Sequence, residues 1–229
     1  MSISNAAYDP TVGAQLYNRY LDEKIYAEEM GFDGLMLNEH HSTPFCMQGV
    51  TNVGASILAR VTKKVKIVIL GNILPIWDDP LWLAETLAMI DMISYGRLVS
   101  GFVRGGGRES VSHNAPPHYN RERFEEAHDF LIKTWTTPGP FRWEGKHFHY
   151  RYVNPWARPF QQPHPPVWVP FTGSKETIER AAHAIGIRQA DQRIGGHDPD
   201  RLDAPVGDRV EHVDGLEAWL YPIQPQDLR

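Results

Sequence analysis

Residues 63–106 read KKVKIVILGNILPIWDDPLWLAETLAMIDMISYGRLVSGFVRGG and are the most informative part of the chain. Val65–Leu70 is an uninterrupted apolar run, which is typical of a parallel strand covered on both faces. Asp79 and Pro80 are residue types that favour the N-cap and the first position of a helix. Arg97–Phe102 is a second apolar run that ends in arginine and glycines. The stretch therefore predicts a strand, a helix and a second strand in that order.

The same alternation continues on both sides of this unit. The further elements that we expect are helices over about 12–30 and 52–61, a strand at Leu35–Leu37, a helix capped by Asn120, a hairpin over Phe141–Tyr150, a strand at Pro166–Val169 and a helix after Ser174. Strands that alternate with helices predict an α/β fold with a parallel sheet. That sheet is either open and doubly wound or part of a (β/α) barrel.

Composition excludes several classes of protein. The chain has 229 residues, with 23 basic against 28 acidic side chains, and no basic stripe of the kind that binds nucleic acid. No run approaches the roughly 18 apolar residues of a membrane span, and Met1–Thr11 lacks the pattern of a secretory signal. Cys46 is the only cysteine, which rules out a disulfide within the chain and suits a reducing compartment. We expect a cytoplasmic protein without a membrane or nucleic-acid partner.

The composition changes near residue 187. Residues 188–229 hold nine acidic residues, five arginines and no lysine, and their apolar residues are scattered among Gly, Pro, Asp and Arg. Such a segment buries little surface. We therefore expect a barrel-type domain over residues 1–187 and a charged, poorly packed tail over residues 188–229.

Polar and glycine-rich clusters follow the predicted strands. They are Asn38–His41, Gly71–Asn72, Arg104–Gly107 and Thr172–Ser174. In a parallel barrel, the carboxyl ends of all strands open on one face, and catalytic groups collect there. The clusters therefore predict one shared site.

Each cluster has a chemical and a plainer interpretation. His40, beside Glu39, can move protons or hold a metal, or the residues can simply cap a turn. Arg104 can grip a phosphate, and the glycines after it allow close approach of a ligand to the backbone, although their spacing does not match a dinucleotide-binding turn.

A second possible phosphate contact lies further along the chain. Thr172, Gly173 and Ser174 open a predicted helix, whose free N–H groups suit phosphate. An ordinary serine N-cap explains the same residues.

Two other patterns suggest different chemistry. His147 and His149 have the spacing of the paired histidines of metal-dependent barrel hydrolases. They lie in the predicted hairpin, however, and the sequence around them offers no further metal ligands, so we expect no metal. Cys46 follows His40 and His41 closely enough to suggest a Cys–His nucleophile, but neither an oxyanion turn nor an orienting Asn accompanies it.

Taken in order, four stretches resemble the bacterial luciferase-like flavin monooxygenases. They are YAEEMGFDGLMLNEHH, the stretch of residues 63–106 quoted above, RFEEAHDFLIKTW, and FRWEGKHFHYRYVNPWARPFQQPHPPVWVPFTGSKETIE. The resemblance covers about residues 12–187 without interruption. It implies a (β/α)₈ barrel that uses reduced FMN and dioxygen to oxygenate a small organic substrate, such as an aldehyde, a sulfonate or a terpene-like molecule.

The resemblance also implies roles for single residues. His40 matches the histidine that manages protons beside the flavin, with Glu39 in support. Asn72 falls on the strand end that lies along the isoalloxazine ring. Arg104 and Gly105 match a phosphate-side or loop contact and a backbone contact.

Thr172, Gly173 and Ser174 match the phosphate turn of this family. Similar enzymes receive reduced flavin from a separate reductase, and family members often form homodimers through helices near the second and third strands. A sister branch uses a deazaflavin for hydride transfer, which remains an alternative for this chain.

The sequence also departs from the family pattern. The apolar strand that opens such barrels is missing before residue 12, and the pattern fails after Ala184, so we expect only about four or five βα units instead of eight. A partial copy of the barrel is therefore predicted. The alternative to an active monooxygenase is that the chain is a catalytically silent remnant of such an enzyme.

Overall fold

The predicted strand–helix–strand unit forms as β2 (Lys66–Ile73), α3 (Pro80–Ile93) and β3 (Leu98–Val103). The two strands are parallel, and Ile67 lies opposite Leu98. Every residue of β2 after the first is buried, as expected for a strand with both faces covered. Asp79 is the N-cap of α3, as predicted, and its side chain accepts hydrogen bonds from the backbone N–H groups of Leu81 and Trp82.

The structure is a computed structural model that describes residues 4–44 and 46–170. The chain divides into two units, Met1–Val167 and Trp168–Arg229. The expected boundary between residues 187 and 188, and the helix expected after Ser174, lie outside the described residues. No helix in the described ranges is both long and apolar enough to cross a membrane.

The other elements mostly follow the predicted order. They are η1 (Asn5–Ala7), α1 (Pro10–Glu29), β1 (Gly34–Leu37), α2 (Thr51–Val61), η2 (Leu74–Ile76), α4 (Gly107–Ser112), η3 (Pro117–Tyr119), α5 (Asn120–Thr136), β4 (Phe141–Glu144), β5 (His149–Val153) and β6 (Val167–Trp168). The hairpin β4–β5 is confirmed and extends three residues further than predicted. Helix α4, which the sequence analysis does not predict, is the main addition.

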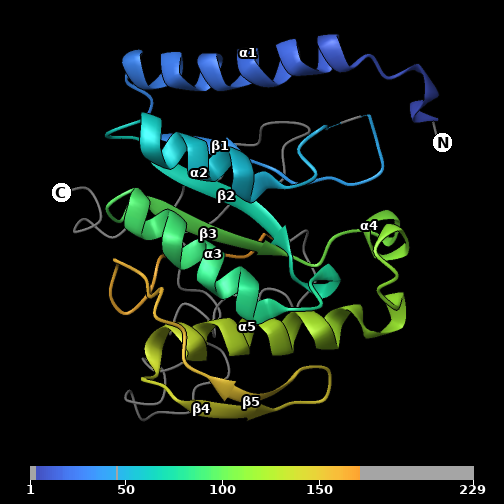
Figure 1. Cartoon of the computed structure of the whole chain (residues 1–229), viewed down its shortest axis with the longest axis vertical. Helices are drawn as coiled ribbons and strands as arrows, with labels where there is room; N and C mark the ends of the chain where they lie inside the picture. Colours follow the sequence, from blue (N-terminus) through green and yellow to red (C-terminus); the bar gives the residue numbers. More distant parts are fainter. Residues whose placement is uncertain (1–3, 45, 171–229) are drawn as a thin grey trace, which may run out of the picture. The chain divides into compact units, whose positions relative to one another are not determined.

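The sheet has the order β1–β2–β3–β6, and β1 and β3 both run parallel to β2. Figure 1 shows α2 and α3 lying across one face of these strands, as crossover helices do in a (β/α) barrel. The α/β class with a parallel sheet is thus confirmed, with four strands of the main sheet among the described residues.

Arg97 fastens the amino-terminal edge of the sheet. Its guanidinium donates hydrogen bonds to the carbonyls of Ala59 (2.8 Å), Thr62 (3.0 Å) and Val65 (2.9 Å), which tie the end of α2 to the start of β2. This edge is therefore closed by a structural network. The loops at the opposite, carboxyl-terminal edge are the ones that carry the predicted site residues.

The role predicted for Asn120 is wrong. It is the first residue of α5, and its predecessor Tyr119 occupies the N-cap position without a capping side-chain hydrogen bond. The Asn120 side chain instead donates to the backbone carbonyl of Arg104 at 2.8 Å. An amide that can cap a helix can equally bind a loop carbonyl, and here the packing of α5 against the loop after β3 decided between them.

Candidate functional site

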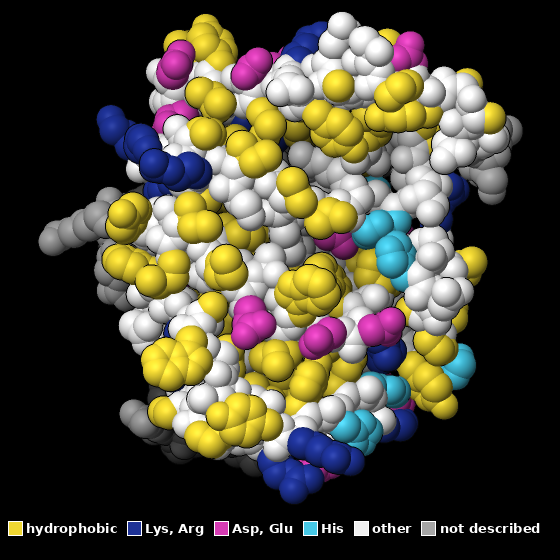
Figure 2. All heavy atoms as spheres, viewed as in Figure 1, with side chains coloured by type: hydrophobic (Ala, Val, Ile, Leu, Met, Phe, Trp, Pro, Cys, Tyr) yellow, Lys and Arg dark blue, Asp and Glu magenta, His cyan; other side chains and the backbone are white. Residues whose placement is uncertain are grey.

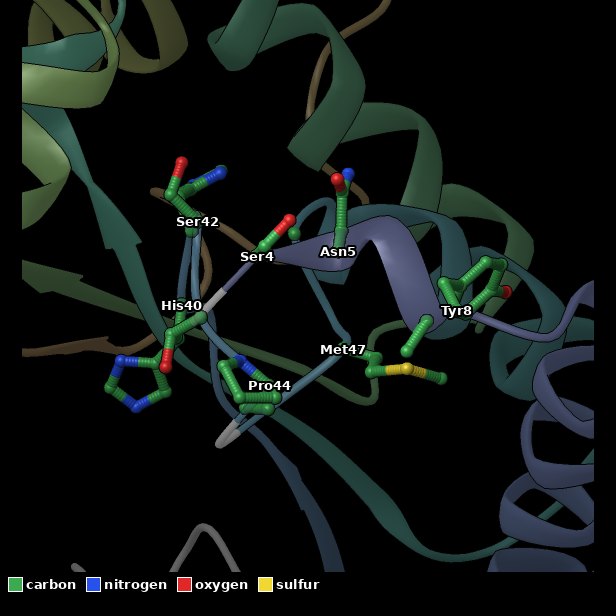
Figure 3. A pocket seen from close by; sticks show the side chains of 12 residues that line it. Ser4, Asn5, Tyr8, His40, Ser42, Pro44 and Met47 are labelled. Atoms are coloured by element: carbon green, nitrogen blue, oxygen red, sulfur yellow. The ribbon is translucent and has the colours of Figure 1, made fainter. Parts of the chain in front are cut away.

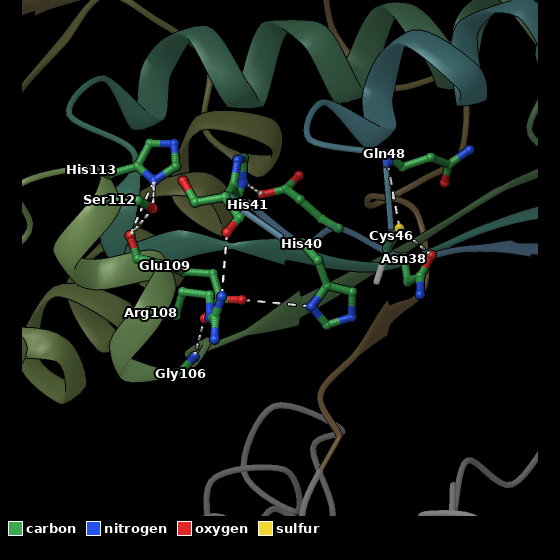
Figure 4. A network of polar contacts seen from close by, with 12 residues as sticks. Asn38, His40, His41, Cys46, Gln48, Gly106, Arg108, Glu109, Ser112 and His113 are labelled. Atoms are coloured by element: carbon green, nitrogen blue, oxygen red, sulfur yellow. Dashed lines mark hydrogen bonds and ion pairs between the residues drawn. The ribbon is translucent and has the colours of Figure 1, made fainter. Parts of the chain in front are cut away.

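Two segments at the carboxyl-terminal edge of the sheet meet at the predicted site. One is the loop that follows β1, and the other comprises the glycines after β3 together with α4. Figure 4 shows His40 and His41 from the first segment facing Glu109, Ser112 and His113 from the second. The topology brings them together because β1 and β3 lie on either side of β2 and point the same way.

The carboxylate that faces His40 belongs to Glu109. His40 Nδ1 lies 3.6 Å from Glu109 Oε1, and the two residues stand 69 positions apart in the chain. The His40 side chain is about one-third exposed, whereas Glu109 is buried. The pair therefore combines a sheltered carboxylate with an imidazole that solvent can reach.

Glu109 also begins helix α4. Its Oε2 accepts a hydrogen bond from the N–H of Gly106 at 3.0 Å, which is one half of a capping box. Burial alone would raise the pKa of Glu109, but hydrogen bonds from its own N–H and that of Gly106, with the contact to His40, outweigh burial and lower the pKa below its ordinary value. The carboxylate is therefore ionised at neutral pH beside His40.

Glu39 contacts a different histidine from the one that the sequence analysis assigns to it. Its Oε1 lies 3.1 Å from His41 Nε2, and its side chain is almost fully buried. The His41 ring meets the His113 ring edge to face, with centroids 4.2 Å apart. Adjacent residues of an extended segment point to opposite sides, so His40 and His41 reach different carboxylates.

Asn72 is fully buried at the end of β2, and its side chain pairs with Asn52 of α2. The Nδ2 of each amide donates to the Oδ1 of the other, at 3.0 and 3.2 Å. The Asn72 side chain is thus directed toward α2, and what this position can offer a ligand is its backbone. The neighbouring Gly71 lies so close to β3 that a Cβ atom would stand 2.7 Å from the carbonyl oxygen of Gly101.

Arg104 and Gly105 lie in the exposed loop after β3. Gly105 has a φ of +69°, which an L side chain rarely adopts. A Cβ atom there would also lie 2.5 Å from Cγ2 of Ile73. Gly107, at the start of α4, has open space where a side chain would stand. The loop thus presents bare backbone with one arginine, a surface that a phosphate-bearing ligand can approach closely.

Thr172, Gly173 and Ser174 are outside the described residues. His147 lies in the hairpin with its Nε2 3.0 Å from Glu122 Oε2. Among residues 4–44 and 46–170, no group of three or more His, Cys, Asp or Glu side chains is placed to hold a metal ion.

The sequence analysis missed two residues of this site, Glu109 and Asn52. The spacing of Gly106 and Glu109 matches the N-cap and N3 positions of a capping box, which could have revealed α4. Nothing in the sequence around Asn52 indicates its pairing with Asn72, because the contact spans 20 residues and depends on how α2 packs on the sheet.

Comparisons with known proteins identify relatives of this chain. Residues 5–187 match the family model described as luciferase-like monooxygenase. The oxygenase component of flavin-dependent trigonelline monooxygenase from Acinetobacter baylyi is 27% identical over 212 residues, which cover 91% of this chain and 58% of that protein. The alkanal monooxygenase alpha chain of Photorhabdus laumondii is 32% identical over 158 residues, which cover 68% of this chain and 43% of the relative.

A solved structure is similar as well. The monooxygenase RslO1 from Streptomyces bottropensis superposes with a TM-score of 0.71 at 28% identity, over 80% of this chain and 55% of that one. The chain spans about half the length of the curated relatives that it matches. The family match over most of the chain, together with the parallel sheet and its strand-end site, shows that the chain belongs to the luciferase-like monooxygenase family.

Proposed function

We propose that this chain is the oxygenase of a flavin-dependent monooxygenase that uses reduced FMN and dioxygen to oxygenate a small organic substrate. The observation that carries the proposal is the meeting of His40 and Glu109, 3.6 Å apart, beside a glycine loop at the carboxyl-terminal edge of a parallel sheet. Active sites of barrels of this type lie at that edge. The substrate classes that we propose remain an aldehyde, a sulfonate or a terpene-like molecule.

The residues at this edge fit a flavin mononucleotide in three respects. The loop of Arg104 and Gly105 offers a cation and uncovered backbone to a phosphate. The backbone at Asn72 offers a buried strand end to the ring system. We assign a further phosphate contact to Thr172, Gly173 and Ser174 on the family resemblance alone.

When bound, reduced FMN supplies two electrons to dioxygen while the substrate supplies two more, so that one oxygen atom enters the substrate and the other leaves as water. In this proposal His40 moves the protons that the reaction requires. Its Nδ1 is turned to Glu109, so Nε2 is the atom that we assign to proton transfer. Glu109 holds the ring in position, and Glu39 acts through His41.

We also propose two protein partners. The Acinetobacter relative is named an oxygenase component, which supports a separate flavin reductase as the source of reduced FMN. A homodimer is supported by the outer surface of α2 and α3, where Figure 2 shows hydrophobic side chains gathered. The exposed apolar residues of these two helices are Val53, Ile57, Val61, Trp82, Met89, Met92 and Ile93. We place the reaction in the cytoplasm.

The proposal is tested by adding a flavin reductase, NADH and FMN to the purified chain. We expect binding of reduced FMN, oxygen uptake coupled to product formation, and loss of product with His40→Ala while FMN binding persists. General acid–base groups accelerate enzymatic reactions by about 10²- to 10⁴-fold. His40→Ala should therefore lower turnover by at least about a hundredfold.

Other results of the same assay point to the alternatives. FMN binding without turnover would identify a catalytically silent relative. Hydride transfer with a deazaflavin, without oxygen uptake, would replace the monooxygenase by an oxidoreductase. Unchanged product formation by His40→Ala would remove His40 from the mechanism.

A further inference from the structure

A cavity of about 690 Å³ lies between the amino-terminal turn and the loop that carries His40. Ser4, Asn5 and Tyr8 stand on one side of it, and Ser42 and Pro44 on the other (Figure 3). Its volume falls within the roughly 300–1,000 Å³ of small-molecule sites in proteins. The His40 ring points away from the labelled amino-terminal residues in Figure 3 and faces Glu109 in Figure 4. The cavity thus adjoins the site built around Glu109 and shares His40 and His41 with it.

The wall of this cavity is more apolar than polar, and its described lining residues carry no permanent charge. Its lining residues are Ser4, Asn5, Ala7, Tyr8, His40, His41, Ser42, Thr43, Pro44, Cys46, Met47 and Gly49, none of which is Lys, Arg, Asp or Glu. The side chains of His40 and His41 are directed at Glu109 and Glu39. The described lining residues offer no counter-ion to an ion, whereas their hydroxyl and amide groups beside apolar surface suit a neutral ligand.

The loop that forms one wall is held in place from several directions. The Tyr17 hydroxyl donates a hydrogen bond to the carbonyl of Met47, and Arg108 Nη1 donates to the carbonyl of Ser42 at 3.3 Å. The His40 N–H closes the loop by donating to the carbonyl of Gln48 at 3.3 Å. Because these contacts fix the loop, the cavity is largely formed before any ligand binds.

Ser42 has an unusual backbone conformation in this wall. Its φ is +54°, in the left-handed region that few residues other than glycine adopt. Such residues persist where the surroundings determine them, and they concentrate at binding and catalytic sites. Ser42, which has this unusual backbone conformation, thus lines the cavity.

We propose that this cavity is a binding site for a neutral organic molecule that carries a hydroxyl or carbonyl group. The ligand lies against the apolar surface of Ala7, Pro44 and Met47 and forms hydrogen bonds with the hydroxyl and amide groups around it. The proposal concerns the protein without flavin, so it can be tested separately from the function proposed above. Because its wall is the loop that carries His40, the bound ligand also restrains that loop.

The test uses three probes of matched size: cyclohexanol, cyclohexanecarboxylate and cyclohexylammonium. Each is titrated into ¹⁵N-labelled full-length protein without flavin, and backbone amide shifts are followed by NMR. Cyclohexanol should move the amides of residues 4–8 and 40–49 and bind at least about tenfold more tightly than either ion, since a tenfold ratio requires only about 1.4 kcal/mol.

Ala7→Trp and Ala6→Trp are matched variants. Both residues lie in η1, but only Ala7 lines the cavity. Ala7→Trp should weaken cyclohexanol binding by at least about tenfold because the indole fills the cavity, and Ala6→Trp should leave it unchanged. If Ala7→Trp does not fold, as judged by circular dichroism, Ala7→Leu is expected to weaken binding in the same direction.

Three results would overturn the proposal. The first is binding of an ion as tightly as cyclohexanol, and the second is equal weakening by the Ala6 and Ala7 variants. The third is the absence of amide shifts at residues 4–8 and 40–49 when cyclohexanol is in large excess. None of these depends on flavin binding, so failure here is distinguishable from failure of the monooxygenase proposal.

Discussion

At the scale of single residues, the contact between His40 and Glu109 shows how strand order determines which side chains come into contact. Glu39 is the chain neighbour of His40, yet it reaches His41 at 3.1 Å. Glu109 reaches His40 because the loops after β1 and β3 meet across the end of β2. Proximity along the chain therefore does not by itself decide which carboxylate contacts which histidine.

Glu109→Gln should lower turnover while leaving FMN binding intact. A hydrogen bond to a charged group is worth about 1.5–3 kcal/mol, which corresponds to roughly 10- to 100-fold in rate if it is lost in the transition state. Because the pKa of Glu109 lies below its ordinary value, the carboxylate is charged throughout the neutral range.

The matched control for Glu109→Gln is Glu29→Gln, at the exposed end of α1. It carries the same chemical change at an exposed position outside the site and should not lower turnover. A Glu109→Gln enzyme with unchanged turnover would show that Glu109 only caps α4.

Asn52 and Asn72 should behave as a coupled pair in unfolding. Asn52→Leu leaves the buried amide of Asn72 without its partner, which should cost about 1–3 kcal/mol of unfolding free energy. Replacing both residues by Leu removes both polar groups and should recover part of that loss. The measurement is urea unfolding of the two single variants and the double variant, and additive losses would contradict the coupling.

At the scale of elements, one carboxylate holds the tip of the hairpin to α5. Glu126 accepts hydrogen bonds from the indole Nε1 of Trp143 (3.1 Å) and from the backbone N–H groups of Lys146 (3.0 Å), His147 (2.8 Å) and Phe148 (3.0 Å). Burial alone would raise the pKa of Glu126, but these donors outweigh it and hold the pKa below its ordinary value.

Glu126→Ala should destabilise the protein by about 3 kcal/mol, because four N–H groups, three of them in partly buried hydrogen bonds, lose a charged acceptor. A carboxylate with a lowered folded-state pKa stabilises the fold at neutral pH, and this contribution disappears as the pH falls through that pKa. The unfolding free energy of Glu126→Ala should therefore fall less than that of the wild type between about pH 7 and about pH 3.

Asp22→Ala, an exposed position of α1, is the control for this measurement. It should leave both the stability at neutral pH and its acid dependence close to wild type. Equal acid dependence of the wild type and Glu126→Ala would mean that this carboxylate is not what fastens the hairpin.

At the scale of the whole molecule, α2 is apolar on two faces. Its inner face packs on the sheet through Ala55 and Leu58, while Val53, Ile57 and Val61 are exposed on its outer face. A helix that is apolar on all sides is normally buried on all sides. The outer surface of α2 and α3 is therefore where we expect a second copy of the chain to pack.

Ile57→Asp should convert the expected homodimer to a monomer. Interface residues at the centre of an apolar contact cost at least about 2 kcal/mol when lost, which raises the dissociation constant by roughly 30-fold. Sedimentation equilibrium measures it directly. Leu16→Asp makes the same change at an exposed apolar position of α1 and should not affect association. A wild-type monomer at high protein concentration would contradict the prediction.

The sequence by itself determined the elements whose signals are local. The apolar run of β2, the Asp79 and Pro80 start of α3 and the hairpin follow from residue types over short windows, so they could be predicted without any knowledge of packing. The clustering of polar residues after strands also followed, since parallel strands end at one edge. The prediction that Asn120 caps a helix was wrong because one side-chain amide has several possible hydrogen-bond partners. The local sequence does not decide among them.

Only the tertiary structure decided which residues meet at that edge. The pairs His40–Glu109, Glu39–His41 and Asn52–Asn72 depend on strand order, on the side of the chain from which each residue projects, and on the packing of α2 and α4. The cavity behind the His40 loop likewise exists only because the amino-terminal turn lies against that loop. Local propensity acts within a few residues, whereas these contacts join segments far apart in the chain, and the free energy that selects among them comes from burial of the whole sheet.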